Sequence, residues 1–265
     1  MTNDDSWQTV PLKKRKGKSN SNKSFKCHTV TSAEKNTNSD QEQVDQLHQD
    51  ILNKIKYIVN NRNKNQIFKP VVEMLTKWKG DFEGADLLCY CLGSFDDFVN
   101  SKYQLAQLIL LRQFLHFKKS NLKSPKDEDI ISDWMESYKI DAEMVQCKIF
   151  DPAFTATDKK VLEKFNFQVL NENNECKDVC ERPAIFYMIH GVKTLHENLF
   201  KSNYESNNLK NVFVIGNDWL REDSGEDSCF KSVEVSCQKI QLGSWLIPEV
   251  FAETFVYFLL KTSYE

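Results

Sequence analysis

The apolar positions of the chain fall into two patterns that alternate from residue 87 to the C-terminal region. Short continuous apolar runs predict strands buried on both faces, and apolar residues spaced three and four apart predict amphipathic helices. Strands are predicted at residues 87–92, 144–150, 167–170, 184–189, 211–215 and 233–240. Helices are predicted from about residue 100 and at residues 127–138, 158–165, 193–200 and 248–261. This alternation predicts a Rossmann-like α/β domain at residues 87–264, with a mainly parallel sheet and helices on both faces.

The segment before this domain has a helical pattern only. Ser39 stands three residues before Glu42, which is the spacing of a capping box, and apolar residues follow at helical spacing as far as Ile58. We therefore predict a helical segment at residues 40–80, made of a first helix at 40–59 and a second at 70–78.

Residues 1–39 lack periodic apolar positions and are rich in Lys, Ser, Asn and Thr, which predicts a disordered tail. The tail contains a run of basic residues: Lys13, Lys14, Arg15, Lys16 and Lys18. Such a run is typical of a nuclear import signal or a site for an acidic partner, and equally of a solvated tail. Both interpretations remain open, and we expect the protein in the cytoplasm and the nucleus.

Charge and composition narrow the class of partner. The chain has 35 basic and 38 acidic residues, so no global basic field favours nucleic acid. Eight cysteines are too few for a disulfide scaffold of this length, and residues 1–20 carry no secretory signal, which predicts reduced thiols. The most apolar windows, 105–115 and 251–260, are too short to span a bilayer of about 30 Å. We expect protein partners and no membrane association.

The candidate site lies where predicted strands end. In a parallel sheet the loops after the strands lie along one edge, and ligands bind where the strand order reverses. Small or polar residues at these ends are the ligand-binding candidates: Gly93, Ser94, Asp151, His190, Asn217 and Asp218.

These residues leave several chemistries open. Ser94, Asp151 and His190 follow the chain order of an α/β-hydrolase triad, but the sequence around Ser94 lacks the second glycine of a nucleophile elbow. Asp151 can bind a ligand or cap the next helix. His190 can bind an anion, a metal or haem iron, or be satisfied by backbone carbonyls. Gly216 and the two residues after it can present amides to an anion or let the chain turn.

The cysteines point to packing rather than to metal. Cys89 and Cys91 fall on the same face of the first predicted strand, where two thiols are typical small core residues. Cys176 and Cys180 have a spacing that zinc can use, but no second pair at matching spacing accompanies them. We expect no metal.

Five short motifs occur in order along the chain: CYCLGSF at 89–95, YQLAQLILL at 103–111, FDPAF at 150–154, FYMIHG at 186–191 and VIGNDW at 214–219. They resemble successive motifs of the Sensitivity to Red Light Reduced family, and SWQTVPLKKRKGK at 6–18 is similar to its tryptophan-plus-basic opening. Two positions differ from the motifs of that family. Cys91 stands where we expect a glycine, and Ile189-His190-Gly191 where we expect Pro-His-Cys.

The resemblance implies a regulator more than an enzyme. Members are described as regulators of circadian-clock input with links to haem-biosynthesis control, and no catalytic activity is established for the family. We therefore predict a regulatory protein that senses a small molecule at the sheet edge, with haem or a small anionic ligand as candidates. The alternative is an enzyme of unknown reaction that acts on a small anionic metabolite.

Overall fold

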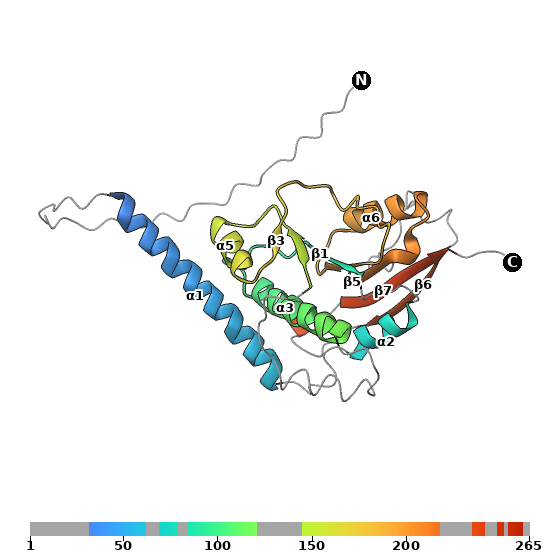
Figure 1. Cartoon of the computed structure of the whole chain (residues 1–265), viewed down its shortest axis with the longest axis horizontal. Coiled ribbons are helices and arrows are strands. Elements are labelled where there is room, and N and C mark those ends of the chain that lie inside the picture. The colour runs from blue at the N-terminus through green and yellow to red at the C-terminus, as the bar shows by residue number, and fades with distance from the viewer. Residues whose placement is uncertain are drawn as a thin grey trace, which may run out of the picture.

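The computed structural model describes residues 32–61, 69–78, 84–120, 145–217, 235–241, 248–251 and 254–261 (Figure 1). The elements in chain order are α1 (Ser32–Asn61), α2 (Lys69–Lys77), β1 (Asp86–Tyr90), α3 (Val99–Ser120), β2 (Cys147–Phe150), α5 (Ala156–Lys164), β3 (Gln168–Val169), β4 (Ala184–Met188), α6 (Lys193–Glu205), η3 (Leu209–Asn211), β5 (Val212–Asn217), β6 (Val235–Gln241), α7 (Pro248–Phe251) and β7 (Thr254–Lys261).

The strands form one sheet in the order β3-β2-β1-β4-β5-β7-β6. All pairings from β3 to β5 are parallel, and β7 is antiparallel to both of its neighbours, β5 and β6. From β1 the chain proceeds outward to β2 and β3, and it then returns to β4 on the other side of β1. The order therefore reverses between β1 and β4, and the predicted Rossmann-like fold is confirmed.

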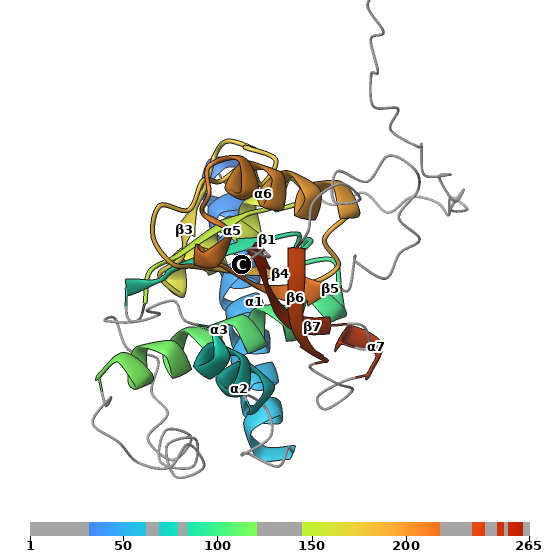
Figure 2. The same ribbon diagram turned by 90° about the vertical axis from the view of Figure 1, so that its right-hand side faces the viewer.

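Alternating side chains of the strands build two core layers. Leu87 and Cys89 of β1 face the layer that contains the buried sides of α1, α2, α3 and α5. Leu88 and Tyr90 face the opposite layer, which α6 covers with Leu199. Figure 2 shows α6 on one side of the sheet and α2 and α3 on the other, so helices cover both faces as predicted.

The long helix α1 shares the core with the sheet. Its buried positions are those of the predicted helical stripe: Val44, Leu47, Ile51, Ile55 and Ile58. Lys102 of α3 donates to Asp50 at 3.0 Å, and the rings of His48 and Phe165 lie 4.6 Å apart. The helical segment and the α/β domain are thus held by one hydrophobic core.

The predicted start of this helix was wrong. α1 begins at Ser32, so Ser39 lies inside the helix and does not cap it, and residues 32–39 of the predicted tail are helical. No glycine or proline interrupts residues 32–39, and a helix extends readily from a packed part through such a sequence.

The C-terminal region holds the largest correction. A helix was predicted at 248–261, but α7 ends at Phe251 and residues 254–261 form β7. The phenylalanines there fit a helical period, yet residues 254–258 are all buried, with Phe255 and Tyr257 in one core layer and Val256 and Phe258 in the other. Burial on both faces between β5 and β6 favours a strand rich in aromatic and β-branched residues.

Smaller differences concern strand ends. β1 ends at Tyr90, two residues before the predicted end, whereas β5 continues through Gly216 to Asn217 instead of breaking there. The predicted helix at 127–138, Asp218 and the basic residues Lys13 to Lys18 lie outside the described residues.

Within the described part, no helix is both long and apolar enough to cross a membrane.

Candidate functional site

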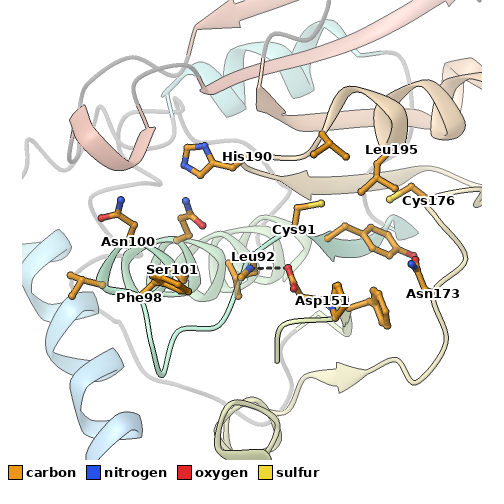
Figure 3. A pocket seen from close by; sticks show the side chains of 17 residues that line it. Cys91, Leu92, Phe98, Asn100, Ser101, Asp151, Asn173, Cys176, His190 and Leu195 are labelled. Atoms are coloured by element: carbon orange, nitrogen blue, oxygen red, sulfur yellow. Dashed lines mark hydrogen bonds between the residues drawn. The ribbon is translucent and has the colours of Figure 1, made fainter. Parts of the chain in front are cut away.

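A cavity of about 690 Å³ opens at the carboxyl ends of β1, β2 and β4, beside the point where the strand order reverses. The residues that line it after the three strands are Cys91, Leu92 and Gly93, then Asp151 and Pro152, then His190 and Val192. The start of α3 contributes Val99 and Gln104, together with Asn100 and Ser101, which Figure 3 labels. This is the position at which open α/β sheets bind ligands.

Asp151 is fixed in the cavity wall by main-chain donors. Its Oδ2 accepts a hydrogen bond from the Gly93 N–H at 2.8 Å, drawn in Figure 3, and its Oδ1 accepts one from the Ala153 N–H at 2.8 Å. The cap of α5 is Thr155, which forms a reciprocal capping box with Asp158. The interpretation of Asp151 as the cap of this helix was therefore wrong, and its carboxylate instead joins the ends of β1 and β2.

His190 lies at the cavity with a left-handed backbone, at φ 64°. Its main-chain N–H donates to Asn217 Oδ1 at 2.9 Å, so the end of β5 holds the loop after β4. The imidazole is exposed and makes no hydrogen bond with any described residue. Asn217 thus holds the backbone of His190 without lining the cavity itself, whereas His190 is one of the lining residues.

Ser94 is separate from the cavity lining. It is buried, and its Oγ accepts a hydrogen bond from the Asp97 N–H at 3.3 Å. No hydrogen bond within the described ranges joins Ser94, Asp151 and His190, and a hydrolase triad is not formed. Of the predicted site residues, Gly93, Asp151 and His190 come together at one cavity.

The predicted arrangement of Cys89 and Cys91 on one face was wrong. Cys89 packs in the layer under α3, whereas Cys91 follows the end of β1, has φ 61° and contacts the opposite layer. A left-handed residue at this position also explains why a glycine is expected there.

Burial keeps the cavity thiols protonated. It raises the pKa of Cys91 to about 11, and it raises the pKa of Cys176, which also lines the cavity. Both thiols are therefore protonated at neutral pH and lack the reactivity of a thiolate nucleophile. In the described part of the chain, no three His, Cys, Asp or Glu side chains are grouped to hold a metal.

Sequence reasoning missed a buried pair beneath the site. His196 is fully buried, and its Nδ1 lies 3.0 Å from the hydroxyl of Tyr257 on β7. Gly191 and Gly216 make room for it, since a Cβ at Gly191 would lie 2.9 Å from His196 Nε2 and one at Gly216 3.2 Å from Cε1. Burial lowers the pKa of His196 to about 4, so the ring is neutral at neutral pH. Gly191 and Gly216, each just after a predicted buried strand, were a usable signal, but Tyr257 could not be placed while β7 was predicted as a helix.

The family model for the SRR1 domain matches residues 49–244. The chain belongs to the SRR1 domain family. This confirms the resemblance identified from the motifs, and the SRR1 domain match includes every residue that lines the cavity. β7, which carries Tyr257, lies beyond the matched range.

Two curated relatives of the SRR1 family match the same share of the chain. The SRR1-like protein of Mus musculus is 30% identical over 131 residues, which are 49% of this chain and 43% of the relative. Protein SENSITIVITY TO RED LIGHT REDUCED 1 of Arabidopsis thaliana is 24% identical over 131 residues, 49% of this chain and 38% of the relative. The match thus spans less than half the length of either relative.

A solved structure, SMU.472, a proposed methyltransferase in complex with SAH, aligns with a TM-score of 0.36 and 9% identity. The alignment covers 78% of this chain and 56% of that chain. A score this low supports no conclusion about ligand or activity.

Proposed function

We propose that this protein is a regulatory member of the SRR1 family that acts by binding a small molecule in the cavity between the ends of β1, β2 and β4. The observation that carries the proposal is the cavity itself, at the reversal point of the sheet, with Asp151 fixed in its wall. Ligands of open α/β sheets bind at this point.

Exposed apolar side chains around the cavity support a binding role. Among the described residues, five large apolar side chains are strongly exposed, and three of them, Phe98, Val99 and Val192, line this cavity. Apolar groups that gather at one concave site favour a bound ligand or partner, whereas scattered ones would need no explanation.

The charge of the lining constrains the ligand. Among the described residues, Asp151 lines the cavity and no Lys or Arg does, so a neutral or cationic molecule fits this wall better than an anion. His190 is the candidate axial ligand if the molecule is haem, but the carboxylates of haem would find no cationic partner in this lining.

Membership of the SRR1 family supports a proposal about the cellular role of the protein. We propose a role in circadian-clock input and in the control of haem biosynthesis, with protein partners, in the cytoplasm and the nucleus. The basic residues Lys13 to Lys18 are the proposed basis of nuclear entry.

The alternative function is an enzyme that acts on a small anionic metabolite, rather than a regulator that only binds its ligand. The same lining disfavours it, since an anionic substrate would meet the Asp151 carboxylate without a Lys or Arg. Turnover of a metabolite by the purified protein would favour the enzyme over the regulator.

Complementation of cells that lack the protein tests the proposal. His190→Ala should keep the melting temperature within a few degrees of wild type, because the exposed imidazole contributes little packing. Asp151→Asn can accept only one of the two main-chain hydrogen bonds with its amide oxygen, so its melting temperature should fall further while the chain remains folded. Both should fail to complement.

The matched control is Asp97→Asn, which removes an exposed carboxylate in the loop after β1 that does not line the cavity. This variant should complement fully. Full complementation by both cavity variants would show that the cavity carries no function, and their unfolding would assign the two residues to stability.

A further inference from the structure

We propose that the cavity binds a ribonucleoside, with the Asp151 carboxylate accepting hydrogen bonds from the two adjacent ribose hydroxyls. The inference rests on the proposed function, in which this cavity binds a small molecule, and it assigns the chemical class of that molecule.

The first observation is the position of the carboxylate. Asp151 is the residue directly after β2, and β2 pairs with β1, the first strand beside the reversal point. In Rossmann-type sheets an acidic side chain on this side of the first strand accepts hydrogen bonds from ribose. The donors on Gly93 and Ala153, each at 2.8 Å, fix the orientation of the carboxylate before any ligand binds.

The second observation is the capacity of that carboxylate. Each oxygen of Asp151 accepts one main-chain hydrogen bond, and a carboxylate oxygen has two acceptor sites. One further donor can therefore bind to each oxygen. Two adjacent hydroxyls of a ribose present two donors at a spacing that one carboxylate can accept together, and hydrogen bonds to an ionised acceptor are strong.

The third observation is the rest of the lining. Tyr90 and Phe150 supply aromatic surface for a planar base. Phe98 and Leu195 add apolar surface and Asn100 supplies a polar edge (Figure 3). A volume of about 690 Å³ lies within the range of small-molecule sites.

The described lining lacks two features of phosphate sites, the glycine-rich loop and the basic side chains. The loop after β1, with sequence CLGSFDD, contains one glycine where dinucleotide sites have Gly-x-Gly-x-x-Gly, and Cys91 occupies its first position. In the part of the chain that the structure describes, no Lys or Arg lines the cavity, and the Asp151 carboxylate is negative. The site therefore favours a nucleoside over a nucleotide that carries phosphates.

The test is calorimetric titration of the purified full chain with adenosine, guanosine, cytidine and uridine, each compared with its 2′-deoxy counterpart. At least one ribonucleoside should bind, and removal of the 2′-hydroxyl should weaken it about tenfold, since one hydrogen bond to a charged acceptor is lost. The 5′-monophosphate should bind no more tightly than the nucleoside.

Asp151→Asn should weaken the ribonucleoside about tenfold and abolish its preference over the deoxy form. Asp97→Asn should leave both affinities unchanged. The comparison of the two sugars uses the wild-type chain alone, so it decides the question even if Asp151→Asn is unstable.

Absence of binding by all four ribonucleosides, or equal affinity for the deoxy forms, would overturn the inference. If cavity variants fail to complement and no ribonucleoside binds, the inference fails while the proposed function stands. If a ribonucleoside binds with the expected preference and Asp151→Asn complements fully, the inference stands and the proposed function fails.

Discussion

His196 shows how individual residues support the cavity from below. It is not among the residues that line the cavity, yet it packs against Gly191 in the loop after β4 and against Gly216 of β5. Its ring also meets the hydroxyl of Tyr257. A neutral imidazole suits this buried position, because a charged ring would have to lose its hydration there.

The lowered pKa makes the stability of the protein depend on pH. An unfolded histidine has a pKa of about 6.5, so between about pH 6.5 and 4 the unfolded chain binds a proton at His196 that the native state does not. Stability is complete above this window and falls as the pH drops through it. The displacement of the pKa corresponds to about 3 kcal/mol.

Urea unfolding at several pH values measures this effect. His196→Gln stays neutral throughout, so its free energy of unfolding should fall about 3 kcal/mol less than that of wild type between pH 7 and 4. His48, whose pKa is also lowered by burial, is kept in both proteins. Parallel pH profiles for the two proteins would contradict a neutral, buried His196.

At the scale of elements, Arg112 joins α3 to the segment that links α5 and β3. The guanidinium is fully buried and donates to the carbonyls of Val145, Phe165 and Asn166 at 2.8, 2.8 and 3.2 Å. It also lies over the Phe167 ring, 4.4 Å from its centre. One side chain thus satisfies two carbonyls where the chain turns from α5 to β3, and a third just before β2.

Arg112→Met should lower the free energy of unfolding by about 3 kcal/mol. Methionine keeps much of the apolar stem but leaves buried carbonyls without this donor, which costs the desolvation energy of each group. Thermal and urea unfolding measure the loss. Lys160→Met on the exposed side of α5 is the control and should change stability by less than about 0.5 kcal/mol. Equal stability of the two variants would show that Arg112 does not hold these elements together.

The pattern of apolar residues predicted some elements better than others for a physical reason. β4 is a short, continuous buried run, which favours a strand, and the residues after it have the apolar spacing of a helix. Each pattern fits only one kind of element. In β7, Phe255 and Phe258 suit a helical period as well as a strand, and the choice is made by the partners β5 and β6, which are distant in sequence. The start of α1 was missed because several residues there can begin a helix equally well.

The site was predicted only as far as strand ends could be predicted. Asp151 and His190 were found because each directly follows a buried run. The sequence could not show that Ser94 turns away from the cavity or that Asn217 holds the His190 backbone, since both depend on loop dihedral angles such as φ 64° at His190. The contact between His196 and Tyr257 was not predicted, because Tyr257 lies on β7, which was predicted as a helix.

At the scale of the whole molecule, one sheet brings three distant segments to the same cavity. Gly93, Asp151 and His190 follow strands that lie far apart in sequence but side by side in the order β2-β1-β4. α1, α3 and α5 pack on one face and α6 on the other, which holds these strand ends in place. We propose that this arrangement of strand ends binds a small molecule.

Native mass spectrometry of the full chain purified from its own cells tests that claim most directly. We predict one small molecule bound per chain in wild type and in Asp97→Asn. It should be depleted from Leu195→Trp, whose larger side chain intrudes into the cavity that Leu195 lines. A melting temperature near that of wild type would show that the tryptophan variant remains folded. Wild-type protein at the mass of the bare chain, or a ligand retained equally by Leu195→Trp, would contradict the account.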